Sequence, residues 1–407
     1  MIVMLVSVDK TRKIVQNMGQ VDEKRRFQML LVKNAEVYAP EYIGKKDILI
    51  CGEKIELILD EIANLPLEHE VIDGTDMILA PGIIDQHVHV TGGGGEGSFH
   101  TRTPELQLSE LVEGGITTVV GLLGTDGLTR SVENLYAKIM ALNEEGVSAY
   151  MLTGAYDHPG PTISGTPEKD ITFIEKVLGV KLAISDHRAP NVTVAELIHL
   201  ASKTRVAGML SGKPGIVTLH MGDAKEALSP VFEALEKTAI PTKVFRPTHV
   251  NRNEWLLEDA YKFLEMGGYI DLTCGIHPDS RPGKCVAEAK KRGLPMKHVT
   301  MSSDGHGSWS NYAEDGTLLE IGVSGVDALL KELVYMVNEI GIPLSEALSY
   351  MASNVADALG LRKGRIAVGF DADLLLMTKE LELQTVIARG KIMMKNKKIV
   401  CKGTYEK

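Results

Sequence analysis

The chain has 407 residues, of which 44% are hydrophobic and 24% are charged, with a formal net charge of −10. This balance is typical of a globular protein with a sizeable core, and the acidic charge argues against a nucleic-acid partner. The chain has no run of about 18 apolar residues, the pattern that predicts a transmembrane helix, so we expect no membrane partner. The four scattered cysteines indicate reduced thiols in a cytoplasmic protein rather than a disulfide framework.

The two ends of the chain share one pattern. Residues 1–28 are mostly polar and weakly patterned, and we expect an N-terminal extension that need not be ordered. Residues 29–80 have the pattern of short strands separated by Gly and Asp, and residues 360–407 repeat it. We therefore expect a small β-sandwich domain built from residues 29–80 and 360–407 together.

Between these ends, residues 81–359 alternate apolar strand-like runs with segments of helical period. Several of the helical segments end in glycine, which is a helix-stop signal. The predicted strands lie within residues 78–90, 116–124, 148–156, 179–185, 215–222, 245–250, 268–275 and 298–305. Eight strands alternating with helices predict an α/β fold, a TIM-like (β/α)₈ barrel, whose active site lies at the carboxyl ends of the strands.

Side chains suited to catalysis gather at those strand ends. His87 and His89 close the first predicted strand, where residues i and i+2 point to one face, so the pair forms half of a metal site. Further candidates at the ends of, or inside, later strands are Tyr156, Lys181, His220, His249 and Asp304. A barrel would bring them into one ring.

Each of these residues also has an ordinary structural interpretation. A lone histidine is more often hydrogen-bonded in the core than a ligand, and a buried lysine usually has an ion-pair partner. Asp304, in SSDG, fits a turn or a helix cap, and Tyr156 fits a core-edge aromatic. Their joint placement at one end of successive strands favours a single site.

Several motifs carry a family resemblance. The pattern PGIIDQHVH, followed by a strand lysine, two strand-end histidines and SSDG, resembles the amidohydrolase superfamily. From about residue 29 to the C-terminus, the chain is similar to the isoaspartyl (beta-aspartyl) dipeptidase family within it. The segments that carry this similarity are DQHVHVTGGGGEG, TRTPE, VVGLLGTDG, MLTGAY, GVKLAISDHR, HMGD, PTHVNRN and SSDGHGS.

The resemblance implies a site for two metal ions, usually Zn²⁺. His87 and His89 would bind one ion, His220 and His249 the other. Lys181, N-carboxylated by CO₂ or bicarbonate, would bridge them, and Asp304 would bind a metal and carry protons. A metal-bridging hydroxide would then attack the amide, with Tyr156 as a donor to the oxyanion.

The implied substrate is a small β-aspartyl dipeptide, which presents a free ammonium and two carboxylates. By the same resemblance, Glu96 holds the ammonium, while Arg188 and Arg252 hold the α-carboxylate. Gly94, Thr125 and Ser308 are candidates for the remaining contacts. For any single arginine, a structural ion pair is the commoner role. A homo-oligomer, an octamer in this family, is also implied.

Other functions remain open or are excluded. Gly92, Gly94 and Gly97 match GxGxxG, but they follow the histidine pair and enclose Glu96, so we expect a flexible lid rather than a dinucleotide site. A cyclic-amide hydrolase of the dihydroorotase or hydantoinase type shares the metal ligands and stays as an alternative. A non-catalytic scaffold relative is a second alternative, although such a chain should have lost ligands.

Overall fold

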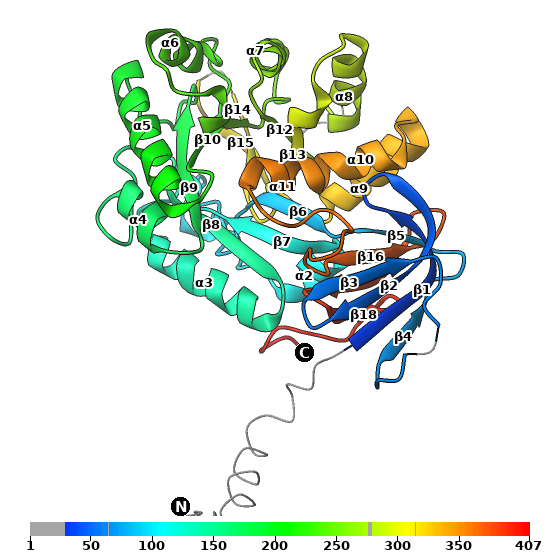
Figure 1. Ribbon diagram of the computed structural model, residues 1–407. Helices are drawn as coiled ribbons and strands as arrows, with labels where there is room; N and C mark the ends of the chain where they lie inside the picture. The colour runs from blue at the N-terminus through cyan, green and yellow to red at the C-terminus, as the bar shows by residue number, and fades with distance from the viewer. Residues whose placement is uncertain (1–28, 64, 276–278, 314) are drawn as a thin grey trace, which may run out of the picture.

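A barrel of parallel strands forms the centre of the molecule (Figure 1). The computed structural model describes residues 29–407 except 64, 276–278 and 314, so the expected extension 1–28 lies outside the described residues. Each of the eight barrel strands pairs with the next in chain order, and a parallel bridge between Val88 and Gly305 joins the last strand's end to the first. The strands are β6 (Ile83–Val88), β7 (Ile116–Gly121), β8 (Ser148–Gly154), β9 (Val177–Ile184), β10 (Ile216–Met221), β11 (Phe245–Thr248), β12 (Ile270–Thr273) and β13 (Val299–Ser302).

Helices surround the barrel and confirm the predicted (β/α)₈ architecture (Figure 1). They are α2 (Leu108–Glu113), α3 (Val132–Glu145), α4 (Pro167–Phe173), α5 (Val194–Ser211), α6 (Ser229–Lys237), α7 (Glu254–Glu265), α8 (Pro282–Lys291), α9 (Ala328–Tyr335), α10 (Leu344–Met351) and α11 (Ser353–Leu359). Short turns are η2 (Phe99–Thr101), η3 (Thr242–Val244), η4 (Met296–His298) and the π-helical η5 (Met336–Ile340). Local signals set their ends: α5 begins with a capping box of Thr193 and Glu196 and ends at Gly212 in the left-handed region.

The two ends of the chain meet in one sheet of nine strands, as the sequence predicted. Its order is β19-β18-β17-β16-β5-β1-β2-β3, with β4 paired to β1, and the blue and orange-red strands lie side by side in Figure 1. The N-terminal strands are β1 (Met29–Tyr38), β2 (Tyr42–Cys51), β3 (Lys54–Leu59), β4 (Glu70–Asp73) and β5 (Ile78–Pro81). The C-terminal strands are β16 (Leu374–Met377), β17 (Leu383–Ala388), β18 (Lys391–Lys395) and β19 (Lys398–Ile399). The antiparallel pair β5–β16 joins the two halves.

The apolar run 78–90, predicted as one strand, forms two strands in different sheets. β5 belongs to the terminal sheet and β6 to the barrel, and Gly82 lies between them. The Gly82 amide donates to the carbonyl of Asp373 (2.8 Å), and a Cβ at this position would lie 2.2 Å from Thr117 Oγ1. Close packing at the junction therefore requires glycine there.

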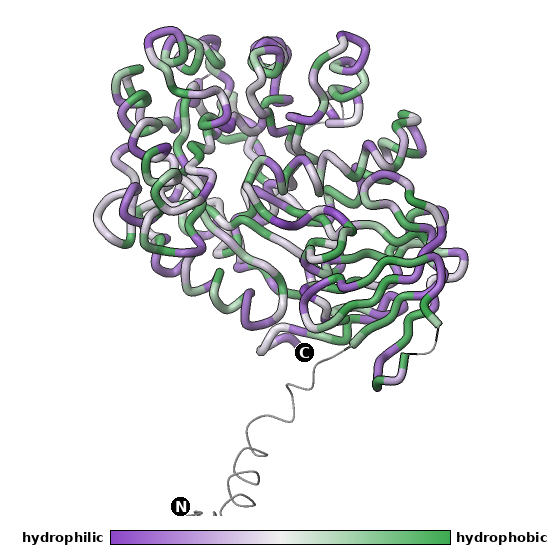
Figure 2. The backbone as a smooth tube through the Cα atoms, in the orientation of Figure 1, coloured by the Kyte–Doolittle hydropathy of each residue, from purple (hydrophilic) through white to green (hydrophobic). Residues whose placement is uncertain are grey.

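The core follows from the burial of the barrel strands on both faces. All residues of β7, β9 and β10 are buried, as expected for parallel strands covered by helices. Figure 2 shows hydrophobic residues running along many of these strands, with hydrophilic ones alternating along the outer helices. Among the helices of the described residues, none is both long and apolar enough to cross a membrane.

One element was not predicted. A two-stranded antiparallel hairpin, β14 (Ser308–Tyr312) and β15 (Leu318–Val323), follows the last barrel strand. Its residues contribute to the wall of a cavity at the end of the barrel.

Candidate active site

The strand ends bring the predicted ligands together. His87 lies in β6, Lys181 in β9 and His220 in β10, whereas His89, His249 and Asp304 directly follow or closely follow their strands. His249 and Asp304 adopt left-handed backbone conformations, with φ of 63° and 54°. Such values are uncommon outside glycine and often mark functional sites, because surrounding structure must hold them.

One group of close contacts consists of His87, His89, Lys181 and Asp304. His87 Nε2 lies 3.0 Å from Lys181 Nζ and 3.3 Å from Asp304 Oδ1. His89 Nε2 lies 3.1 Å from the same carboxylate oxygen. His87, His249 and Asp304 each offer one ligand atom, and these three atoms lie within 4.8 Å of one another. This spacing suits a single cation.

Hydrogen bonds turn two imidazoles toward this point. Thr248 Oγ1 donates to Asp271 Oδ2 (2.7 Å), so it can only accept from His87 Nδ1, 3.3 Å away. His249 Nδ1 lies 2.8 Å from Thr273 Oγ1, a contact that also fixes the direction of its ring. Because Nδ1 then carries the proton, the lone pair of His87 Nε2 faces the Asp304 carboxylate. Two acceptors facing each other fit a metal ion between them.

Burial sets the protonation of the cluster. It lowers the pKa of His87, His220 and His249 well below the usual range, so these rings are neutral, as metal ligation requires. Burial also lowers the pKa of Lys181 to about 7, although the charges of Asp304 and Asp271 oppose the change. A fully buried lysine with a neutral amine is unusual in a structural core.

His220 is placed differently from the other ligand candidates. Its ring centroid is 4.7 Å from that of His249, but Nδ1 lies 2.6 Å from Tyr156 Oη and Nε2 lies 3.0 Å from Asp186 Oδ2. Both ring nitrogens are therefore engaged. The expected second pair, His220 with His249, is adjacent, yet His220 must exchange one of these partners before it can bind an ion.

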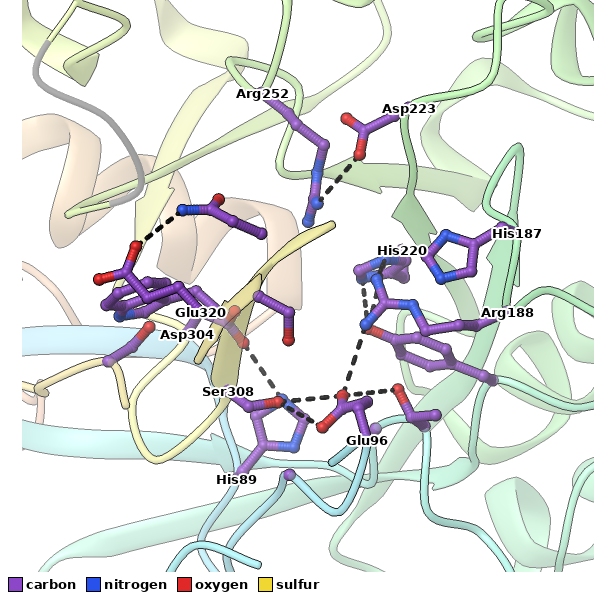
Figure 3. A pocket seen from close by; sticks show the side chains of 18 of the residues that line it. His89, Glu96, His187, Arg188, His220, Asp223, Arg252, Asp304, Ser308 and Glu320 are labelled. Atoms are coloured by element: carbon purple, nitrogen blue, oxygen red, sulfur yellow. Dashed lines mark hydrogen bonds and ion pairs between the residues drawn. The ribbon is translucent and has the colours of Figure 1, made fainter. Parts of the chain in front are cut away.

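A cavity of about 470 Å³ opens over the cluster (Figure 3). The residues proposed from sequence that line it are His89, Gly94, Glu96, Thr125, Tyr156, Arg188, His220, Arg252, Asp304 and Ser308. His87, Lys181 and His249 lie deeper, each no more than 1% exposed. Metal-ligand and substrate candidates therefore occupy one site.

Glu96 is the centre of the substrate side of this cavity. Its carboxylate accepts hydrogen bonds from Ser308 Oγ (2.9 and 3.0 Å) and Thr125 Oγ1 (3.1 Å), and Arg188 Nη1 lies 3.4 Å away (Figure 3). The Glu96 side chain is only 6% exposed. These contacts hold a carboxylate that faces the cavity and can pair with a cation.

Sequence reasoning missed Asp186, which holds Arg188 and His220. Arg188 donates from Nε and Nη2 to both Asp186 oxygens at 2.9 and 2.8 Å. Burial favours a raised pKa for Asp186, but the hydrogen bonds from Arg188 and His220 outweigh it and hold that pKa well below the usual range. Asp186 stands in SDHR, directly after a predicted strand, and that position was the available signal.

Further lining residues were not among the predicted site residues, although Asp223 belongs to the predicted HMGD motif. Asp223 Oδ2 is 3.9 Å from Arg252 Nη1, and Arg252 Nε is buried without a hydrogen-bond partner in the described part of the chain. The unpredicted hairpin contributes Trp309, Ser310, Asn311 and Glu320. Asn311 Nδ2 donates to Glu320 Oε2 at 3.1 Å, which links the two hairpin strands across the cavity mouth.

Comparison with known proteins identifies the family. The Amidohydrolase family model matches residues 278–393. The structure of a Beta-aspartyl dipeptidase from Fervidobacterium islandicum AW-1, in complex with beta-Asp-Leu dipeptide, is 42% identical with a TM-score of 0.89, covering 92% of this chain and 98% of that chain. The chain belongs to the amidohydrolase family, and within it to the beta-aspartyl dipeptidases, as the motifs predicted.

Other relatives are more distant. A Dihydroorotase of Streptococcus pyogenes serotype M3 is 32% identical over 401 residues, covering 87% of this chain and 91% of its own length. A D-hydantoinase structure is 21% identical with a TM-score of 0.66, covering 93% of this chain and 98% of that chain, and shows a shared fold.

Proposed function

We propose that this chain is a metal-dependent dipeptidase that hydrolyses the isopeptide bond of β-aspartyl dipeptides. The observation that carries the proposal is the setting of Glu96, a nearly buried carboxylate at the cavity wall, with Arg188 and Arg252 lining the same cavity. A β-aspartyl dipeptide offers one ammonium and two carboxylates to such a set. The 42% identity to a dipeptidase structure that holds beta-Asp-Leu supports this assignment.

In this proposal, Glu96 pairs with the substrate ammonium and Arg252 with its α-carboxylate, with Arg188 beside them. Arginine suits the carboxylate because its fork donates two parallel hydrogen bonds. Thr125, Ser308 and Gly94, which line the cavity, complete the pocket. Ser308 and Thr125 already hydrogen-bond Glu96 and so fix its direction.

The donor set fits metal ions, and we propose two, with zinc as the expected metal. They would be held by His87, His89, Lys181, His220, His249 and Asp304. When bound, the ions supply Lewis acidity that polarises the scissile carbonyl and activates water. Lys181 as a bridge would require N-carboxylation: its neutral amine adds to CO₂, an N–C bond forms, and one proton is released. The lowered pKa of the buried amine supports that reaction.

The chain's own groups would handle protons and charge. Asp304 accepts the proton released as water adds to the amide carbonyl and returns it to the departing nitrogen, so aspartate and one amino acid leave. Burial raises the pKa of Tyr156 far above its usual range, and its hydroxyl therefore stays protonated. That hydroxyl is a donor for the developing oxyanion.

The rival activity is hydrolysis of a cyclic amide, which the 32% identity to a Dihydroorotase favours. Dihydroorotate has no free ammonium, so Glu96 would face no cation there. A scaffold function is disfavoured because all six ligand candidates are retained.

The test is a hydrolysis assay on β-Asp-Leu, α-Asp-Leu and dihydroorotate, with and without chelator. We expect turnover of β-Asp-Leu alone, lost on chelation and restored by zinc with bicarbonate. The Glu96→Gln variant, which keeps the shape but not the charge, should lose β-Asp-Leu turnover while retaining metal. Turnover of dihydroorotate only would overturn the proposal.

We further propose a homo-oligomer in the cytoplasm. Val206, Met209 and Leu210 lie on one face of α5 and are 53%, 69% and 76% exposed, a pattern that suits an interface. The four cysteines are free thiols, which is consistent with a reducing compartment. Sedimentation of the purified chain tests the assembly.

A further inference from the structure

The loop that carries Glu96 is held by buried polar contacts. We define the glycine loop as residues 92–97, of which the first three glycines are buried. The Gly93 amide donates to both Thr103 Oγ1 (2.6 Å) and the His306 carbonyl (3.1 Å), and the Gly93 carbonyl accepts from the Thr103 amide (3.0 Å). Three hydrogen bonds thus fix one residue of this loop.

A buried arginine holds the same segment from the other side. Arg130 is 8% exposed, and its guanidinium donates to the carbonyls of Thr91, Gly93 and Thr103, the last two at 3.0 Å. Arg130 also forms an ion pair with Asp126, but this contact is long, with 4.0 Å between Nε and the carboxylate oxygen. The charge of Arg130 is therefore directed mainly at backbone carbonyls, which makes strong hydrogen bonds.

The contacts also join the glycine loop to the loop that carries Asp304. Thr103 Oγ1 donates to the His306 carbonyl at 2.7 Å, and His306 Nδ1 lies 2.9 Å from the Pro104 carbonyl. His306 stands two residues after Asp304 and two before Ser308, the donor to Glu96. These contacts therefore connect the glycine loop, which carries Glu96, to the loop that carries Asp304.

This packing gives a reason for the glycines other than flexibility. A Cβ on Gly92, whose φ is +79°, would lie 2.3 Å from the Thr103 carbonyl oxygen and 3.0 Å from Arg130 Nη2. A Cβ on Gly94, whose φ is +74°, would lie 2.4 Å from the Thr101 carbonyl oxygen. The expected flexible lid is, over its first three glycines, a closely packed segment.

We infer that Arg130 and Thr103 are positioning residues that fix Glu96 relative to Asp304 and thereby determine selectivity for a free substrate ammonium. Neither side chain lines the cavity. The inference rests on the proposed function, because it holds that these contacts affect binding of the ammonium of a β-aspartyl dipeptide. A purely structural role would instead affect all ligands of the site equally.

The experiment compares two ligands that differ only at the ammonium. β-Asp-Leu carries it, and succinyl-leucine has hydrogen in its place. Thr103→Val removes the hydroxyl and keeps the shape, whereas Thr103→Ser keeps the hydroxyl. Arg130→Met tests the guanidinium, and Arg205→Met, on the exposed surface of α5, is the distant control. KM for β-Asp-Leu, the inhibition constant of succinyl-leucine and the metal content are measured for each.

We expect KM for β-Asp-Leu to rise about tenfold in Thr103→Val and Arg130→Met, the scale of one weakened hydrogen bond to a charged group. The inhibition constant of succinyl-leucine and the metal content should stay at the wild-type level, as should every value in Thr103→Ser and Arg205→Met. Equal losses for both ligands, or no loss for either, would overturn the inference.

Hydrogen exchange provides a readout that needs no substrate. Amides of the glycine loop should exchange faster in Thr103→Val than in wild type, and at the wild-type rate in Thr103→Ser. Unchanged exchange in Thr103→Val would also overturn the inference. If the wild-type chain fails to hydrolyse β-Asp-Leu, the proposed function fails, whatever the exchange rates show about the loop.

Discussion

Arg188 and Arg252 line the same cavity but differ in their existing partners. Arg188 already donates to both oxygens of Asp186, whereas within the described part of the chain Arg252 has only a 3.9 Å ion-pair contact with Asp223. Asp186 in turn lies 3.0 Å from His220 Nε2. Arg252 is therefore the freer carboxylate receptor, and Arg188 also holds the position of a proposed metal ligand.

The two arginines should give different kinetic defects. Arg252→Met should raise KM for β-Asp-Leu about 10- to 100-fold, the scale of a lost hydrogen bond to a charged group, with metal content unchanged. Arg188→Met should also reduce metal content, because Asp186 and His220 lose a partner. Steady-state kinetics with metal analysis checks both. A full metal complement in Arg188→Met would confine that residue to substrate binding.

Lys181→Ala should lower kcat/KM by more than about 100-fold, beyond the usual effect of a residue that only supports a ligand. Added short carboxylic acids should restore part of the activity by supplying the missing oxygen ligands. Lys176→Ala, on a side chain that is 20% exposed outside the cluster, is the control. Undiminished activity in Lys181→Ala would remove the residue from the mechanism.

At the residue scale, the sequence predicted the ligand types because position at a strand end is a local property. The four histidines, Lys181 and Asp304 were found this way, and the structure brings them to one end of the barrel. Asp186 was missed although it directly follows a predicted strand, because its contact with His220, 34 residues away, leaves no pattern in the sequence. Arg130 was missed for the same reason.

At the element scale, periodicity identified every barrel strand but could not divide the run 78–90. An apolar run indicates burial without saying which sheet buries it, and the division depends on the contact between Gly82 and Thr117. The hairpin β14–β15 was missed because no residue of its second strand is buried, so that strand has no apolar face packed on the core.

The connection before β16 depends on a buried ion cluster. Lys363, whose side chain is 3% exposed, contacts Asp371 and Asp373 at 2.6 Å, and Lys54, the first residue of β3, also pairs with Asp371. Burial alone would raise the pKa of Asp371, but the charges and hydrogen bonds of Lys363 and Lys54 hold that pKa below its ordinary value. The cluster ties β3 to the C-terminal segment.

Asp371→Asn should therefore reduce the free energy of unfolding by about 1–3 kcal/mol at neutral pH, less than for a fully buried pair. A carboxylate with a lowered folded-state pKa stabilises above its unfolded pKa, so the deficit should be full above about pH 5 and shrink as pH falls through the lower folded value. Denaturant unfolding from about pH 2 to 7, which spans the unfolded and the lowered folded pKa, measures it. Asp357→Asn, in an exposed pair with Arg365, should cost less than about 1 kcal/mol. A pH-independent deficit in Asp371→Asn would contradict the ionic origin.

At the scale of the whole molecule, the barrel holds an unusual polar interior. His87, His220, His249 and Lys181 are each no more than 2% exposed, and Asp85 and Asp271 are buried beneath them. Burying so many ionisable groups is costly unless they are paired, so bound cations should contribute to stability as well as to catalysis.

Removal of metal should consequently lower the thermal midpoint by several degrees. An ion present at a hundredfold excess over its dissociation constant stabilises the folded chain by about 2.7 kcal/mol. Thermal scans before and after chelation measure the shift, and zinc with bicarbonate should reverse it. The same midpoint with and without chelator would exclude a structural contribution of metal.

The antiparallel pair β5–β16 has a consequence for how the chain is made. β5 ends at Pro81, whereas its partner begins at Leu374, so the ribosome must release nearly the whole chain before they can meet. Until then, an apolar strand edge stays open beside the first barrel strand, and such edges invite aggregation. The terminal sheet therefore closes only after strands translated long after β5 have appeared, and a nascent chain stalled before residue 374 should be a ready client for chaperones.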